Sequence, residues 1–426
     1  MIQLRLPSGG LVGRAELPFS KSLSNRQLIV GAHTGAPFTI EGLSEGEDTY
    51  YLLRALAALG YIIQRDGIVW TFLPPSSYPS RVELYTGEGG TTLRFLLPLL
   101  ARLPLQAYVH VGNSLRGRPI LPLLQSLQRA GAHVRLAPNT YPLSIVGDPE
   151  WDPTSFYIDS SLSSQFLSAL MLMAPGLKAG TVIYELAQKP ATPAYSEMTR
   201  KLLQLYGWNW QQSENSWQLE TSDEKQKLYA FRGERDWSAA SFFFGWAALG
   251  AFSGTLPLSL ESIQPEARLF SSLQWGYTIT PASDEAFITP LGEPLHGKEI
   301  EVENYPDAVL VLSVIAAVAE NPTRLRGIHT LPYKETDRLQ ALITELSKIG
   351  ATLVVQGEDL IVYPTESLPK EPIVLESYGD HRTAMALSLL AARMPAVIIK
   401  QHECVSKSFP RYWVVLESLG AECRII

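Results

Sequence analysis

The sequence is poor in cysteine. It has two cysteines among 426 residues, Cys404 and Cys423, too few for a disulfide framework and without the clustering of a zinc site. We therefore expect a reduced, cytoplasmic setting. The start of the chain, MIQLRLPSGG, lacks a basic segment followed by an apolar core, so no signal peptide is expected.

Long apolar runs and an excess of positive charge are also missing. The most apolar stretches, 242–252 and 309–319, are about 11 residues long, whereas a membrane span needs about 20. Lys and Arg number 35 against 42 Asp and Glu, a formal charge of 35 − 42 = −7. Bulk attraction to nucleic acid or to an anionic membrane is therefore not expected, and any anion must be bound locally.

Motifs of metal, nucleotide and nucleophile sites are lacking as well. No metal-ligand spacing, GxGxxG or GxSxG occurs. The segment GEPLHGK (292–298) has the spacing of a phosphate-binding loop, but Glu299 replaces the Ser or Thr that would hold magnesium and Pro294 removes a backbone donor. The scattered Trp and Tyr residues favour sheet packing over base stacking. We expect no metal, no cofactor and no nucleic-acid partner.

What the sequence does contain is a repeat. A helix-like run, a glycine and a non-polar residue recur six times, with spacings of 71, 76, 69, 74 and 70 residues, and 426/6 = 71. Glycine is the usual left-handed stop of a helix. The repeated glycines are Gly60, Gly131, Gly207, Gly276, Gly350 and Gly420.

A second, more uniformly apolar helix series follows the same period. One unit thus contains a buried helix, a strand, an amphipathic helix and a hairpin, which predicts an α/β fold of six units arranged as two domains of three. The buried helices are expected to begin near Lys21, Gly90, Ser163, Trp237, Pro306 and Asp380.

The domain boundaries follow from the last unit. It ends in one strand, AECRII, and needs a hairpin partner that the N-terminal segment can supply. We expect an N-terminal domain of residues 20–233 and a C-terminal domain of residues 1–19 plus 234–426. Two chain crossings would then form a hinge that permits closure around a ligand.

Chemically capable residues gather at the expected helix starts. Ser and Asp there are ordinary caps when taken singly. Cations at a helix start oppose the helix dipole, so their presence indicates an anionic ligand. The cations near expected helix starts are Lys21, Arg118, Lys334, His381, Arg382 and Lys407.

The segment KETDR places Lys334 and Arg338 four residues apart, which predicts one helical face. An exposed, salt-bridged face is the alternative interpretation. Asp307 and Glu335 are candidates for proton transfer, although an aspartate at a helix start is usually a cap.

Together these segments resemble one family. SKSLSNR, GEGGTTLR, RGRPI, SSLSSQF, PDA, LPYKETDR, GDHRTAMALSL and CVSKSFPRY are similar, in order, to the signature segments of the EPSP synthases, the 3-phosphoshikimate 1-carboxyvinyltransferases. The resemblance runs from Pro18 to the C-terminus. It implies an inside-out α/β barrel of two three-unit domains. It also implies a monomer that joins phosphoenolpyruvate to the 5-hydroxyl of shikimate 3-phosphate in the interdomain cleft and releases phosphate, with no metal or cofactor.

The resemblance also implies residue roles. Asp307 would receive the 5-hydroxyl proton and Glu335 would protonate the methylene carbon, with Lys21, His381 and Lys407 completing the catalytic set. Shikimate 3-phosphate would be held by Lys21, Ser22, Arg26, Ser163, Ser164, Gln165, Thr192, Asp307 and Lys334. Phosphoenolpyruvate would be held by Lys21, Gly90, Arg118, Gln165, Arg338, Arg382 and Lys407.

Three positions depart from the family pattern. Glu88 stands where Asn or Ser is usual, which puts an anion near the phosphoenolpyruvate site. Thr192 takes the place of a serine, and Thr330 replaces a frequent Asn. Two alternatives stay open: an enolpyruvyl transferase acting on UDP-N-acetylglucosamine, and a non-catalytic anion-binding scaffold. The first usually carries a loop cysteine in the first half of the chain, where this sequence has none.

Overall fold

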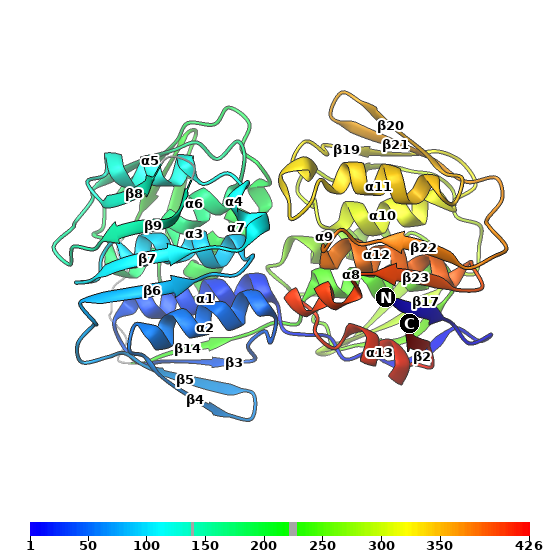
Figure 1. Cartoon of the computed structure of the whole chain (residues 1–426), viewed down its shortest axis with the longest axis horizontal. Helices are drawn as coiled ribbons and strands as arrows, with labels where there is room; N and C mark the ends of the chain where they lie inside the picture. The colour runs from blue at the N-terminus through cyan, green and yellow to red at the C-terminus, as the bar shows by residue number, and fades with distance from the viewer. Residues whose placement is uncertain (138–139, 221–227) are drawn as a thin grey trace. The chain divides into compact units, whose positions relative to one another are not determined.

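The computed structural model describes residues 1–137, 140–220 and 228–426. The chain divides into two compact units. The N-terminal unit is Phe19–Glu234, and the C-terminal unit is Met1–Pro18 with Arg235–Ile426. Figure 1 traces the chain by colour from the N-terminus to the C-terminus.

The described strands form six four-stranded sheets with one shared plan, so the predicted sixfold α/β repeat is confirmed. In each sheet one edge strand pairs parallel with its neighbour. The other neighbouring strands of the sheet pair antiparallel. In the N-terminal unit the sheets are β14 (Tyr229–Arg232), β3 (Phe38–Glu41), β5 (Val69–Leu73) and β4 (Ile62–Asp66); β6 (Arg81–Tyr85), β7 (Gln106–His110), β9 (Thr140–Val146) and β8 (His133–Ala137); and β10 (Ser155–Ile158), β11 (Val182–Glu185), β13 (Ser216–Leu219) and β12 (Trp210–Ser213).

The C-terminal unit repeats this plan. Its sheets are β2 (Leu11–Arg14), β15 (Phe252–Leu256), β17 (Glu285–Pro290) and β16 (Tyr277–Ala282); β18 (Glu299–Glu301), β19 (Thr323–Arg326), β21 (Asp359–Tyr363) and β20 (Thr352–Gln356); and β22 (Ile373–Glu376), β23 (Val397–Lys400), β1 (Ile2–Arg5) and β24 (Glu422–Ile425). Strand β1 pairs antiparallel with both β23 and β24, so the first strand of the chain completes the last sheet. The marked N- and C-termini therefore belong to the same sheet (Figure 1).

The two chain crossings each separate a strand from the helix that follows it. Strand β14 precedes helix α8 (Trp237–Ala248) in sequence, but it pairs with β3 of the N-terminal unit. Strand β2 precedes helix α1 (Lys21–Thr34), but it pairs with β15 of the C-terminal unit. Each unit therefore keeps a strand whose following helix belongs to the other unit. The repeat period did not predict which strands β14 and β2 pair with.

The apolar helices form the interior of each unit. Every residue of α3, α8, α10 and α12 is buried. Helices α8 and α10 are apolar on nearly all sides and therefore need cover on every side. Helix α3 contacts α1 and α6, and α10 contacts α8 and α12. Besides α1 and α8, the series contains α3 (Gly90–Leu100), α6 (Ser164–Met171), α10 (Ala308–Ala317) and α12 (His381–Ser388).

The amphipathic helices cover this interior. They are α2 (Glu47–Ala58), α5 (Leu121–Arg129), α7 (Pro193–Leu205), α9 (Pro265–Leu273), α11 (Arg338–Ser347) and α13 (Tyr412–Ser418). The six repeat glycines have φ between +79° and +106°, the left-handed conformation expected after these helices. Short helical turns complete the described chain: α4 (Asn113–Arg116), η1 (Ala174–Gly176), η2 (Leu331–Tyr333), η3 (Leu389–Ala392) and η4 (His402–Lys407). Among the described helices, none has the length and apolarity to span a bilayer.

Two predicted helix starts were wrong. Helix α11 begins at Arg338 and not near Lys334, because Asp337 caps it by accepting the Gln340 N–H at 3.0 Å. Lys334 and Arg338 therefore do not share a helical face. Helix α13 begins at Tyr412, and Lys407 ends the 3₁₀ turn η4. Pro410 disfavours helical geometry at the residue before it, which separates the two helical segments.

Candidate active site

In the N-terminal unit, the first side chain of α1 is an ion-paired lysine. The Lys21 ammonium lies 3.0 Å from the Asp48 carboxylate, and both side chains are almost fully buried. Ser20 caps the helix by accepting the Leu23 N–H. Asp48 lies in the first turn of α2, where an acid is favourable. The sequence did not predict Asp48 as the partner of Lys21.

The start of α3 lies against two guanidinium groups. A Cβ on Gly90 would lie 2.9 Å from a terminal nitrogen of Arg118 and 2.9 Å from one of Arg94. Glycine is therefore required for these groups to approach the backbone so closely. Arg94 donates to the Gln165 side-chain oxygen at 2.6 Å, which links α3 to α6. The predicted phosphoenolpyruvate residues Gly90, Arg118 and Gln165 are thus brought together, and Arg94 of the GEGGTTLR segment lies among them.

A group of hydroxyls marks the start of α6. Ser163 caps the helix by accepting the Gln165 N–H at 3.3 Å. The Ser164 and Thr192 hydroxyl oxygens lie 2.9 Å apart, and Thr192 has φ of +46° at the start of α7. The three predicted phosphate-contacting residues therefore lie on two adjacent helix starts, where free N–H groups favour an anion.

Arg26 is buried deeper in the N-terminal unit. Its guanidinium donates to the Thr199 hydroxyl at 2.7 Å and to the Ser22 carbonyl at 2.9 Å. It also lies over the Phe95 ring, 5.2 Å from the ring centre. Burial lowers the pKa of Arg26 to about 10, which leaves it charged at neutral pH. The structure thus ties Arg26 to α1, α3 and α7.

The C-terminal unit centres on Arg338, the first residue of α11. This guanidinium is 1% exposed and is surrounded by three carboxylates. It donates to Asp380 at 2.7 and 3.4 Å, to Asp307 at 2.6 Å and to Glu335 at 3.1 Å. Although burial lowers the pKa of Arg338, these carboxylates raise it well above its usual value.

Asp307 lies between two arginines. Its second oxygen is 2.9 Å from the Arg382 guanidinium, and its side chain makes no capping hydrogen bond to α10. Burial favours the neutral acid, but Arg382, Arg338 and Lys334 outweigh burial and hold the pKa of Asp307 well below its usual value. The carboxyl is therefore ionised at neutral pH.

Glu335 is held in a similar way, between Arg338 and the Lys407 ammonium at 3.2 Å. The two candidate proton-transfer groups thus each contact two cations, and they share Arg338. This arrangement comes from four segments: the start of α10, the turn before α11, the start of α12 and the end of η4. The predicted residues Asp307, Glu335, Arg338, Arg382 and Lys407 form one cluster.

Asp380 supports this cluster and was missed as a functional residue. It is fully buried, caps α12 by accepting the Arg382 N–H at 2.8 Å, and holds Arg338 through both oxygens. The fully buried His381 ring nitrogen Nδ1 lies 3.6 Å from an Asp380 oxygen. The sequence suggested only that Asp380 caps the helix. In the structure Asp380 caps α12 and also binds the Arg338 guanidinium.

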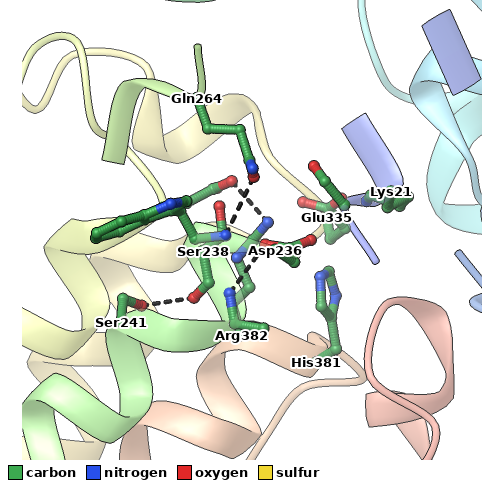
Figure 2. A network of polar contacts seen from close by, with 12 residues as sticks. Lys21, Asp236, Ser238, Ser241, Gln264, Glu335, His381 and Arg382 are labelled. Carbon is green, nitrogen blue, oxygen red and sulfur yellow. Dashed lines mark hydrogen bonds and ion pairs between the residues drawn. The ribbon is translucent and has the colours of Figure 1, made fainter. Parts of the chain in front are cut away.

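A second polar network lies at the starts of α8 and α9 (Figure 2). The Gln264 side chain accepts the Trp237 N–H at 3.1 Å and donates to the Arg235 carbonyl at 2.8 Å. Asp236 caps α8 by accepting the Ala239 N–H at 2.9 Å. This network holds the chain between β14 and α8, just after it enters the C-terminal unit. In the described part of the chain, no group of three or more His, Cys, Asp or Glu side chains could hold a metal ion.

Comparisons with known proteins identify relatives of the whole chain. A family model described as EPSP synthase (3-phosphoshikimate 1-carboxyvinyltransferase) matches residues 7–416. The 3-phosphoshikimate 1-carboxyvinyltransferase of Dehalococcoides mccartyi is 30% identical over 424 residues and 99% of both chains. That of Vibrio campbellii is 34% identical over 429 residues, 97% of this chain and 98% of the relative.

Solved structures share the fold. An EPSP synthase from Acinetobacter baumannii matches with a TM-score of 0.78 at 23% identity, over 100% of both chains. The enolpyruvyl transferase NikO from Streptomyces tendae matches with a TM-score of 0.75 at 18% identity, over 99% of this chain and 98% of that chain. At such identities the likeness concerns the fold alone.

Asp307 is ion-paired with Arg338 and Arg382, so its contribution to the free energy of unfolding depends on pH. Because its pKa is lower in the folded chain than its usual value of 3.8, its carboxylate stabilises the fold at neutral pH and loses this effect as the pH falls through the acid range, from about 5 downward. Asp307→Asn should lower the free energy of unfolding at pH 7 by about 1–3 kcal/mol. Urea unfolding at pH 7 and at lower pH should show this deficit shrinking in acid.

The matched control is Asp284→Asn, on an exposed turn. It should leave the free energy of unfolding unchanged within about 0.5 kcal/mol. A deficit for Asp307→Asn that stays constant as the pH falls would contradict the assigned ion pairs.

Proposed function

The chain belongs to the EPSP synthase family, the 3-phosphoshikimate 1-carboxyvinyltransferases, and we propose that it transfers the enolpyruvyl group of phosphoenolpyruvate to the 5-hydroxyl of shikimate 3-phosphate. One observation supports this most directly. Two carboxylates, Asp307 and Glu335, are each held between two cations in a single cluster. An addition that moves one proton off a hydroxyl and another onto carbon needs two such groups.

The reaction proceeds by addition and elimination. In the addition, the substrate 5-oxygen bonds to the enol carbon of phosphoenolpyruvate, Asp307 takes the hydroxyl proton, and Glu335 gives a proton to the methylene carbon. In the elimination, the bond from that carbon to the phosphate oxygen breaks, and the new methyl group returns a proton to Glu335. Asp307 gives up the hydroxyl proton to the phosphate, which leaves as hydrogen phosphate, and the enol double bond is restored on the product.

The cations stabilise the anionic groups along this path. The tetrahedral intermediate has a carboxylate and a phosphate on one carbon, and fixed cations favour its formation. In the C-terminal unit these are Arg338, Arg382 and Lys407, and in the N-terminal unit Lys21 and Arg118. His381 is fully buried beside Asp380, in keeping with a catalytic role within this cluster.

Shikimate 3-phosphate takes the remaining predicted positions. Its phosphate is assigned to the hydroxyls of Ser163, Ser164 and Thr192, which gather on two helix starts. Gln165, held by Arg94, borders both substrates. Ser22 and Arg26 of α1 and Lys334 of the C-terminal unit complete the set.

The resting ion pairs also suggest how substrate binding prepares the site. Asp307 and Glu335 occupy the same cations that phosphoenolpyruvate needs. When the substrate anion binds these cations, Asp307 loses part of the field that keeps it ionised, and part of the positive charge around Glu335 is offset. Glu335 must carry a proton before it can act as an acid, so binding of the anion and proton uptake by Glu335 are coupled in this account.

The site and the cysteines support two further proposals. Cys404 and Cys423 are free thiols, and burial raises the pKa of each to about 12, in keeping with a cytoplasmic, reducing setting. One chain carries every residue assigned to the reaction, in keeping with an active monomer. Sedimentation at micromolar concentration tests the second proposal directly.

A substrate assay tests the proposed function. Purified protein should release phosphate from phosphoenolpyruvate when shikimate 3-phosphate is added, and it should release none with UDP-N-acetylglucosamine. Activity only with the second acceptor would assign the chain to the other transferase. Activity with neither would favour an anion-binding scaffold.

Variants test the two carboxylate roles. Asp307→Ala and Glu335→Ala should each slow turnover by at least about a hundredfold, because each removes a proton-transfer group. Far-ultraviolet circular dichroism would show that the fold is kept. Asp359→Ala, which removes a surface ion pair with Arg324, is the control and should turn over at the wild-type rate. Near-normal turnover in both active-site variants would refute the assignment.

A further inference from the structure

The departure at Glu88 has a defined place in the structure. Glu88 lies in the turn before α3, and its carboxylate reaches the first turn of α4. One oxygen accepts the Leu115 N–H at 3.1 Å and the Ser114 hydroxyl at 2.5 Å. The acidic side chain thus meets free N–H groups at the start of a helical turn, where negative charge is favourable.

Gly112 makes room for this contact. A Cβ at Gly112 would lie 2.1 Å from one Glu88 carboxylate oxygen. The same two segments are joined by backbone hydrogen bonds, from the Gly112 N–H to the Gly87 carbonyl at 2.8 Å and from the Thr86 N–H to the His110 carbonyl at 3.0 Å. Glu88 adds a side-chain link between these segments, beside the hydrogen bond from the Thr86 hydroxyl to the His110 carbonyl at 3.3 Å.

The hydrogen bonds that begin at Glu88 extend through Leu115 to Arg118. Leu115, which donates its N–H to Glu88, accepts the Arg118 N–H at its carbonyl at 3.2 Å. The Arg118 guanidinium in turn lies against Gly90, two residues after Glu88. The segments 86–90 and 112–118 therefore contact each other at both ends, with the Glu88 carboxylate between these ends.

We propose that Glu88 is a positioning residue that fixes α4 and thereby sets Arg118 for the anionic groups of phosphoenolpyruvate. The proposal rests on the proposed function. It removes the conflict that the sequence suggested, because the Glu88 carboxylate is hydrogen-bonded at the start of α4. Both of its described hydrogen bonds end on one oxygen, so an amide oxygen at the same place can accept both.

The test measures phosphoenolpyruvate affinity without turnover. Calorimetry gives Kd for phosphoenolpyruvate, alone and with 5-deoxyshikimate 3-phosphate, which lacks the reacting hydroxyl. Glu88→Ala should weaken binding by about five- to tenfold, and Glu88→Gln should stay within about twofold of wild type. With shikimate 3-phosphate, Glu88→Ala should raise KM for phosphoenolpyruvate and leave kcat and KM for the shikimate within about twofold.

A double-mutant cycle identifies the route of the effect. In an Arg118→Ala background, Glu88→Ala should cause no further loss of affinity, because the residue that it positions is gone. Glu83→Ala is the charge control, since it removes an exposed carboxylate of β6 that pairs with Arg81. It should leave Kd unchanged, and thermal melting would show that every variant is folded.

Several results would overturn the proposal. These are tighter binding by Glu88→Ala, equal losses in Glu88→Ala and Glu88→Gln, an additive loss in the Arg118→Ala background, or no phosphoenolpyruvate binding by the wild type. A wild type that binds phosphoenolpyruvate but does not turn over with shikimate 3-phosphate would refute the proposed function alone. The positioning role would still be decided by Kd.

Discussion

A guanidinium buried among three carboxylates is the interaction on which the C-terminal part of the site depends. Arg338 cannot leave its partners without exposing a buried charge, and it holds Asp307, Glu335 and Asp380 at once. Through Asp380 it is tied to the start of α12, which also carries Arg382. The start of α10, the turn before α11 and the start of α12 are therefore fixed by one charge.

The same ion pairs explain why the resting site does not conflict with its chemistry. Asp307, which lies between two arginines, is a weak base in this state, and Glu335 lies between an arginine and a lysine. We propose that both become fit for proton transfer when a bound substrate anion offsets the charge of these cations. The N-terminal unit offers substrate anions different groups. These are hydroxyls on helix starts, a lysine paired with Asp48, and guanidinium groups against Gly90.

Much of this could be predicted from the sequence because the repeat is local. A glycine with positive φ ends each amphipathic helix, and the buried helices begin within two residues of the expected positions. The starts of α11 and α13 could not be predicted, since side-chain capping by Asp337 and the position of Pro410 outweigh the period. The exchange of β2 and β14 between units depends on pairing across long stretches of sequence, which periodicity does not record.

The residues of the site likewise divide into those that the sequence predicted and those that it did not. Motifs predicted most of its members, but they did not predict the contacts of Asp48, Arg94 and Asp380, because these contacts form only when distant segments meet. We propose that the substrate anion and the proton-transfer carboxylates compete for the same cations. Calorimetric titration of phosphoenolpyruvate, with 5-deoxyshikimate 3-phosphate present and in buffers of different ionisation enthalpy, counts the protons taken up. The account predicts greater uptake by the wild type than by Glu335→Gln, and equal uptake by both would contradict it.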